Sequence, residues 1–171
     1  MSPSIRTKAI VAACVAVTLG ALDLGVSNLE RNRTSRQDIE LSERAARITN
    51  LVMQVRRFEK DSLLGLVNRD QDGTYAKKWD DSRGLLSDAI ARTSDLDLSE
   101  QDRHALRQIA TDYSIYVDGY ERVLSMIHSG QIRTAQQAIE RISTYQDPVE
   151  RMQANSAAIN ARAQQRINKI T

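Results

Sequence analysis

The feature that most constrains this chain is a repeated spacing of apolar residues by three and four positions. Four such stretches fall within residues 45–66, 75–89, 106–127 and 138–170. This spacing places one apolar face along each of four helices. Only seven glycines and two prolines occur in 171 residues, so few positions can end a helix. The pattern therefore predicts an all-α protein.

Short segments separate the four stretches. "NRDQDG" occupies residues 68–73, "TSDLDLS" occupies 93–99, and Gly130 follows the third stretch. Short connections make successive helices neighbours that run in opposite directions. We therefore expect an antiparallel up-down-up-down four-helix bundle.

Two residues indicate helix boundaries. The hydroxyl of Ser99 can accept a hydrogen bond from a free N–H group at the start of the third helix, so we expect Ser99 to be its N-cap. Pro148 lies inside the fourth stretch. Because proline has no N–H group and its ring clashes with the preceding turn, we expect a kink or break near residues 145–148.

The N-terminus departs from the polar composition. Residues 9–22, "AIVAACVAVTLGAL", carry no charge, and the weakly apolar stretch continues past Asp23 to Leu29. About 20 residues are needed to cross a bilayer. We therefore expect a transmembrane helix over residues 9–29, preceded by a short cytoplasmic N-terminus over residues 1–8.

A cleaved signal peptide is the alternative for this segment. The sequence "LGA" at residues 19–21 places a bulky leucine where a signal peptidase site usually has a small residue, which favours the uncleaved anchor. Both alternatives direct residues 30–171 to an extracytoplasmic compartment.

Charge and composition exclude several classes of function. Arg6 and Lys8 account for the formal charge of +2, and the rest of the chain is balanced, which argues against a nucleic-acid-binding protein. The single cysteine, Cys14, excludes an internal disulfide and a cysteine-based metal site. His104 and His128 are interpreted as surface residues. No phosphate-binding loop, nucleophile elbow or zinc motif is present, so we expect neither an enzyme nor a cofactor.

The segment "LVMQVRRFEKDSLLGL", residues 51–66, places charges among apolar residues. Glu59 occupies a position of the apolar face, where an unpaired carboxylate is costly. We expect a structural polar network in which Lys60, an arginine from another helix or a tyrosine meets this carboxylate. Arg56 and Arg57 lie on the flanks of that face. Their planar guanidinium groups suit a ligand carboxylate, although pairing with surface acids is the alternative.

Tyrosines are concentrated in the second half of the chain. Tyr113, Tyr116 and Tyr120 share the inward face of the third helix, and Tyr145 lies on the apolar face of the fourth. Such tyrosines either pack in the core or supply hydroxyl groups to a polar pocket between helices. The spacing leaves both roles open.

Together these features resemble the ligand-binding region of bacterial methyl-accepting chemotaxis proteins of the four-helix-bundle type. The stretch "RRFEKDSLL", residues 56–64, is similar to an Arg-Arg-x-Glu-Lys-Asp-aromatic-Leu-Leu run of such sensors, with Ser62 in place of the aromatic residue. The resemblance implies a homodimer through the first helix and a small carboxylate or amino acid ligand. Carried over by position, it suggests the following ligand-binding residues: Arg56, Arg57, Tyr116, Tyr120 and Tyr145.

The expected function is therefore extracytoplasmic ligand sensing by a transmembrane chemoreceptor. Residues 30–171 would form a periplasmic sensor domain anchored in a bacterial inner membrane. A ligand between helices or at the dimer interface would displace a helix that returns to the membrane. Three alternatives stay open from sequence: the input domain of a sensor kinase or other membrane receptor, an exported periplasmic helical binding protein, and a spacer bundle without a small-molecule ligand.

Overall fold

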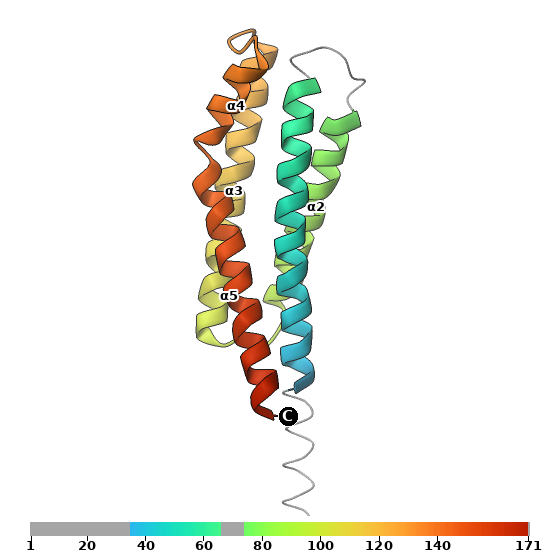
Figure 1. Ribbon diagram of the computed structural model, residues 1–171, viewed down its shortest axis with the longest axis vertical. Coiled ribbons are helices and arrows are strands. Elements are labelled where there is room, and N and C mark those ends of the chain that lie inside the picture. Colours follow the sequence, from blue (N-terminus) through green and yellow to red (C-terminus); the bar gives the residue numbers. More distant parts are fainter. Residues whose placement is uncertain (1–34, 66–73, 171) are drawn as a thin grey trace, which may run out of the picture.

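The computed structural model describes residues 35–65 and 74–170, and the chain is almost entirely helical over these ranges (Figure 1). The first helix covers residues 35–65. It is followed by α2 (Thr74–Ser94), α3 (Glu100–His128), α4 (Ala135–Ser143) and α5 (Gln146–Ile170). No strand occurs within the described ranges. The prediction of an all-α protein is confirmed.

Successive helices alternate in direction along the long axis of the molecule (Figure 1). The first helix and α3 rise in this view, whereas α2 and the α4–α5 pair descend. The start of the first helix and the end of α5 therefore lie together at the lower end. A contact confirms this proximity, because Arg166 Nε donates a hydrogen bond of 2.7 Å to Asp38 Oδ1.

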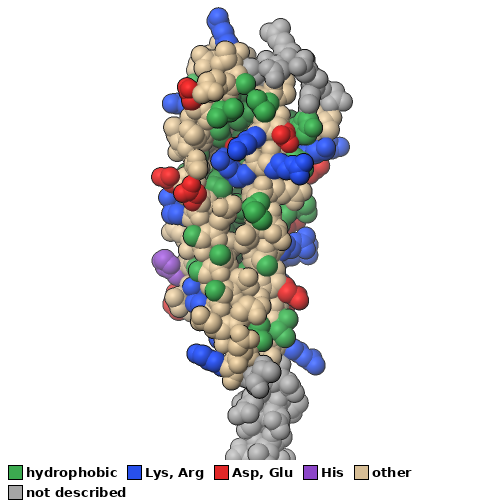
Figure 2. Space-filling view, viewed as in Figure 1, with side chains coloured by type: hydrophobic (Ala, Val, Ile, Leu, Met, Phe, Trp, Pro, Cys, Tyr) green, Lys and Arg blue, Asp and Glu red, His purple; other side chains and the backbone are tan. Residues whose placement is uncertain are grey.

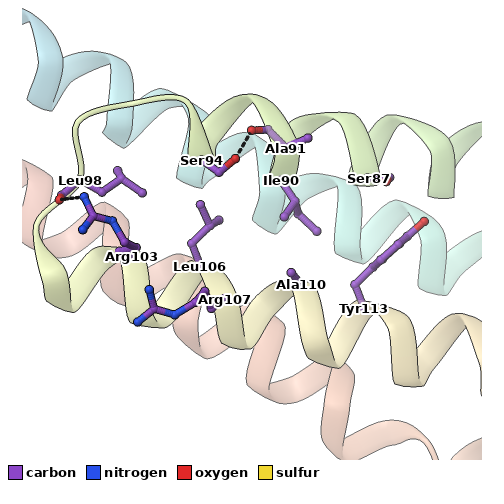
Figure 3. A pocket seen from close by; sticks show the side chains of 10 residues that line it. All are labelled: Ser87, Ile90, Ala91, Ser94, Leu98, Arg103, Leu106, Arg107, Ala110 and Tyr113. Atoms are coloured by element: carbon purple, nitrogen blue, oxygen red, sulfur yellow. Dashed lines mark hydrogen bonds between the residues drawn. The ribbon is translucent and has the colours of Figure 1, made fainter.

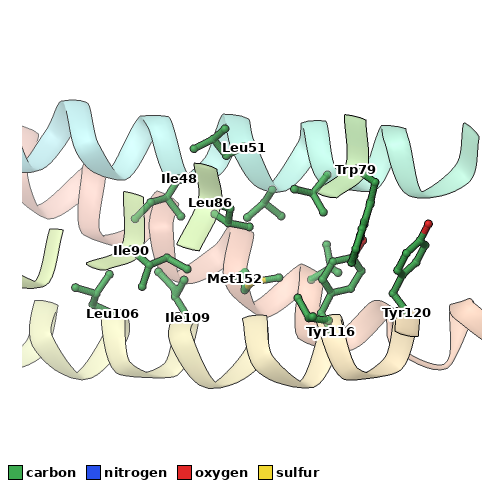
Figure 4. Packing of buried hydrophobic residues seen from close by; sticks show 14 of the residues in the cluster. Ile48, Leu51, Trp79, Leu86, Ile90, Leu106, Ile109, Tyr116, Tyr120 and Met152 are labelled. Atoms are coloured by element: carbon green, nitrogen blue, oxygen red, sulfur yellow. The ribbon is translucent and has the colours of Figure 1, made fainter. Parts of the chain in front are cut away.

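The apolar faces of the helices meet in a single core (Figure 4). The side chains buried most completely come from every long helix: Ile48, Val52, Val55, Leu86, Ile109, Tyr116, Tyr120, Met152 and Ile159. Removing apolar surface from water stabilises the fold by about 25 cal/mol per Å². The three-and-four spacing thus marks the buried face, as the sequence predicts.

Polar residues cap the starts of α3 and α4, and a glycine follows the end of α3. Ser99 Oγ accepts a hydrogen bond of 3.1 Å from the N–H of Asp102 and is the N-cap of α3, as predicted. Thr134 and Gln137 form a reciprocal capping box at the start of α4. Gly130 follows α3 with a φ of 74°, a conformation that glycine adopts without steric cost.

The predicted break near Pro148 is present. α4 ends at Ser143 and α5 begins at Gln146, and the N–H of Tyr145 donates to Ile142 O at 2.9 Å between them. Pro148 consequently lies in the first turn of α5, where a helix does not require its missing N–H group. The two helices together occupy the place of one long helix (Figure 1).

No helix in residues 35–65 or 74–170 combines the length and the apolar character needed to cross a bilayer. The expected N-terminus over residues 1–8 and the expected anchor over residues 9–29 lie outside the described residues.

Candidate functional site

A groove of about 480 Å³ lies between the first helix and the beginning of α5. The first helix contributes Met53, Arg56, Arg57, Lys60 and Asp61, and α5 contributes Gln146, Val149, Glu150 and Gln153. Figure 2 shows lysine and arginine side chains gathered on the face that these two helices form. The groove thus contains both arginines that the sequence suggested.

Helical spacing explains why the cations share this groove. Residues three and four apart lie on the same side of a helix, so Arg56, Arg57 and Lys60 project to one side of the first helix. Three cations face two carboxylates here, those of Asp61 and Glu150. The lining thus contains one more cation than carboxylate, and the charge of Arg56 is also met by Glu59 behind the groove.

Arg56 connects the groove to the core. Its Nη1 donates a hydrogen bond of 2.7 Å to Oε1 of Glu59, whose side chain is fully buried, whereas the Arg56 side chain is 20% exposed. Among the described residues, Glu59 Oε2 meets no donor at hydrogen-bond geometry. Burial raises the pKa of Glu59, and the charge of Arg56 and the hydroxyl of Tyr116 oppose this rise only in part. Glu59 is thus paired with Arg56 of its own helix, whereas Lys60, a partner that the sequence suggested, lines the groove.

Two of the three suggested tyrosines lie in the core rather than in the groove. Tyr116 and Tyr120 are 1% and 0% exposed. Trp79 Nε1 donates to the Tyr116 hydroxyl at 3.1 Å, and the Tyr120 hydroxyl donates to Ser62 Oγ at 2.8 Å. The rings of Trp79 and Tyr120 stack with centroids 3.8 Å apart. Burial raises the pKa of Tyr120 to about 12 and that of Tyr116 above its usual range, so both hydroxyls stay protonated.

Tyr145 lies away from the groove. It lines a separate hollow together with Arg122 and Arg141, and its ring packs against Gly119 of α3. The structure therefore brings Arg56, Arg57 and Lys60 together and places all three suggested tyrosines elsewhere. A ligand in the groove would contact none of them in this conformation.

The sequence analysis missed a second charged cluster, at the lower end of the molecule. Asp102 is fully buried; Arg162 Nε donates to its Oδ1 at 2.7 Å, and Arg166 Nη1 lies 3.1 Å from its Oδ2. Arg166 also pairs with Asp38 of the first helix. One signal was available, because Asp102 precedes Leu106 by four positions and so continues the apolar face of α3. Each charge here has a protein partner, which indicates a structural role.

Comparison with protein-family models, with curated proteins and with solved structures finds no match. In the described part of the chain, no cluster of three or more histidine, cysteine or acidic side chains could hold a metal ion. His104 and His128 are both exposed.

The buried Glu59 predicts a specific dependence of stability on pH. Burial raises its pKa above the ordinary value of 4.5 for a glutamate, so the folded state holds the proton more tightly than the unfolded state. The resulting stabilisation is complete below about pH 4.5 and is lost as pH rises through the raised pKa. Glu59→Gln removes this loss, since the amide does not ionise.

We therefore expect Glu59→Gln to be more stable than the parent at pH 7 and to show a flatter stability profile between pH 5 and 8. Urea unfolding across this range measures the effect. Asp61→Asn, at a neighbouring position, is the control and should keep the parent profile. A Glu59→Gln profile parallel to that of the parent would contradict the interpretation.

Proposed function

We propose that this chain is the sensor region of a membrane receptor and that it binds a small carboxylate in the groove between the first helix and α5. The observation that carries the proposal is the placement of Arg57, Arg56 and Lys60 along one wall of a 480 Å³ groove. Ligand pockets usually have volumes of about 300–1,000 Å³. The opposite wall is formed by Gln146, Val149, Glu150 and Gln153 of the first turns of α5.

The two arginines have different roles in this proposal. Arg57 is exposed and can turn its guanidinium group to a ligand carboxylate at little cost. Arg56 already shares a hydrogen bond with buried Glu59. A bound anion would pair with Arg56 and weaken the attraction between Arg56 and Glu59. The pKa of Glu59, which is already raised, would then rise further. Anion binding is thus expected to be somewhat tighter at lower pH, as long as the ligand stays ionised.

The contact between the first helix and α5 suits a sensor that transmits a movement. Below the groove this contact contains hydrogen bonds between small polar groups. Ser42 lies 2.6 Å from both Asn160 and Gln164, and Thr49 lies 2.8 Å from Ser156. Such bonds contribute about 0.5–1.5 kcal/mol each and can exchange partners. A ligand that pulls on the start of α5 can therefore shift this helix against the first one.

The remaining parts of the proposal follow from the chemotaxis-receptor resemblance. We propose a four-helix bundle anchored in a bacterial inner membrane through residues 9–29, with the described helices in the periplasm. A homodimer through the first helix is consistent with three large apolar side chains that are partly exposed there: Ile39, Met53 and Leu64, at 43%, 50% and 38%. Met53 also lines the groove, so a partner subunit would lie beside the ligand.

A thermal-shift screen of the full chain against organic acids and amino acids tests the binding proposal. A ligand at 100 times its dissociation constant stabilises the fold by about 2.7 kcal/mol, which for a chain of this size raises the melting temperature by roughly 5–10 °C. We expect at least one carboxylate to produce such a shift in the parent and Arg57→Ala to lose most of it.

Arg36→Ala is the matched control, because Arg36 is an exposed arginine of the same helix far from the groove. It should respond to the ligand as the parent does. The proposal fails if no anion stabilises the parent, or if the two variants respond equally.

A further inference from the structure

A second and larger groove separates α2 from α3 on a different face of the molecule. It has a volume of about 520 Å³. Its floor consists of the side chains of Ile90, Leu98 and Leu106, which point into the space between the two helices (Figure 3). These three residues belong to the core and are only 4–8% exposed, so the groove lies directly above the core. An apolar hollow of this size suits the body of a small organic molecule.

The two ends of this groove differ chemically. The ring of Tyr113 closes one end, and its hydroxyl donates to Arg83 O at 3.0 Å. Arg103 and Arg107 of α3 flank the other end (Figure 3). A ligand that fills the groove would thus have its apolar body against Ile90 and Leu106 and its polar group near two guanidinium groups.

The two arginines share a single carboxylate. Arg103 Nη1 lies 3.2 Å from one oxygen of Glu100, and Arg107 Nη2 lies 3.0 Å from the other. The Glu100 side chain is 74% exposed, so it is not held in place by packing. Because two cations meet one exposed anion, the pair has capacity for a second carboxylate, or for one that displaces Glu100.

We propose that the α2–α3 groove binds an amphiphilic monocarboxylate, with its apolar body between the helices and its carboxylate on Arg103 and Arg107. This ligand class differs from a small polar acid, which would gain nothing from the apolar floor. It also differs from a neutral apolar molecule, which would leave the two guanidinium groups unused. The site shares no residue with the groove of the proposed function and stands independently of it.

Isothermal titration calorimetry of the full chain tests this proposal. The probes are two amphiphilic acids, octanoate and phenylacetate, and the comparison compounds are acetate and octan-1-ol. We expect at least one probe to bind at least tenfold more tightly than acetate and octan-1-ol. If octanoate alone binds, the site takes aliphatic acids, and if phenylacetate alone binds, it takes aromatic acids. The absence of binding by both probes would overturn the proposal.

Three variants locate the binding. Arg107→Ala removes one guanidinium group, and Ala91→Phe fills the groove from an exposed position of α2; each should weaken probe binding about tenfold or more. Glu100→Gln removes the carboxylate that the two arginines share and leaves the hydrogen bond from Arg103 Nη2 to Leu98 O in place, so it should tighten binding severalfold. These substitutions are at exposed positions, and circular dichroism melts check that each variant is folded.

Arg57→Ala is the control that separates the two sites. It should leave probe binding in the α2–α3 groove unchanged. If Arg57→Ala abolishes probe binding and Arg107→Ala does not, the probes occupy the other groove and the present proposal is wrong. Sedimentation of the parent and of Ala91→Phe tests whether a second copy of the chain occupies the groove instead of a small molecule. If the parent is a dimer that Ala91→Phe dissociates, the groove is a contact between copies, and the proposal is again wrong.

Discussion

Replacement of Asp102 by alanine should lower the free energy of unfolding by about 3–5 kcal/mol, the usual cost of breaking a buried ion pair. Asp102 is fully buried and pairs with both Arg162 and Arg166. Without it, Arg166 keeps Asp38 as a partner, whereas Arg162 keeps no acidic partner among the described residues. Arg162 Nη2 is buried and already has no hydrogen-bond partner among the described residues. The variant would leave further guanidinium N–H groups without an acceptor.

The pKa of Asp102 explains the sign of this effect. Burial acts to raise this pKa, but the hydrogen bonds from Ser99 and Arg162 and the charges of Arg162 and Arg166 together hold the pKa below the ordinary value of 3.8 for an aspartate. A lowered pKa contributes stability that is present above about pH 3.8 and is lost as pH falls through the folded value. The loss in the variant should therefore be largest at neutral pH and smallest in strong acid.

Urea unfolding followed by circular dichroism measures this loss. Asp97→Ala is the control, because Asp97 is an exposed residue of the segment before α3 and should change stability by less than about 0.5 kcal/mol. Equal stabilities of the two variants at pH 7 would show that the charged cluster does not stabilise the fold.

The second large effect is expected at Gly119, in the middle of α3. A Cβ atom at this position would lie 2.4 Å from Cδ1 and 2.5 Å from Cγ of Tyr145. Both atoms lie near the base of the ring, so relief of the clash requires a shift of the Tyr145 side chain or of the turn between α4 and α5. Gly119→Ala should therefore destabilise the protein by about 1–3 kcal/mol, the usual cost of overpacking.

Gly84→Ala provides a matched comparison with the opposite expected sign. Gly84 is an exposed glycine inside α2, and a Cβ atom there would meet nothing within 4 Å. Alanine at such a position stabilises a helix by about 0.5–1 kcal/mol. Thermal unfolding of both variants tests the contrast. If Gly119→Ala and Gly84→Ala both stabilise the protein, Tyr145 does not pack closely on α3 in solution.

The sequence predicts the helices well because their signals are local. The buried face of each helix follows from spacing, Ser99 marks a helix start, and Pro148 marks a break. The position of Glu59 on the apolar face is consistent with its burial in the structure. The identity of its partner, Arg56, was not predicted, because a residue three positions earlier on the same helix can point either to the core or to solvent.

The candidate site was only half predictable. Arg56 and Arg57 were suggested because they flank the apolar face and match the Arg-Arg run of the chemotaxis-receptor resemblance. The residues of α5 that complete the groove, such as Gln146 and Gln153, have no distinguishing signal in the sequence. The pair between Asp38 and Arg166 joins residues 128 positions apart. Such pairs depend on which helices are neighbours, and the apolar spacing does not encode that.

We propose that an anion in the groove between the first helix and α5 changes how α5 lies against the first helix. Spin labels at two exposed positions near the lower end, Gln37→Cys and Gln165→Cys, report on this contact in the full chain with Cys14→Ser. With a carboxylate identified by the thermal-shift screen, electron paramagnetic resonance should show an altered distance distribution, and Arg57→Ala should abolish the change. An unaltered distribution at saturating ligand would contradict the account, because binding would then leave α5 in place.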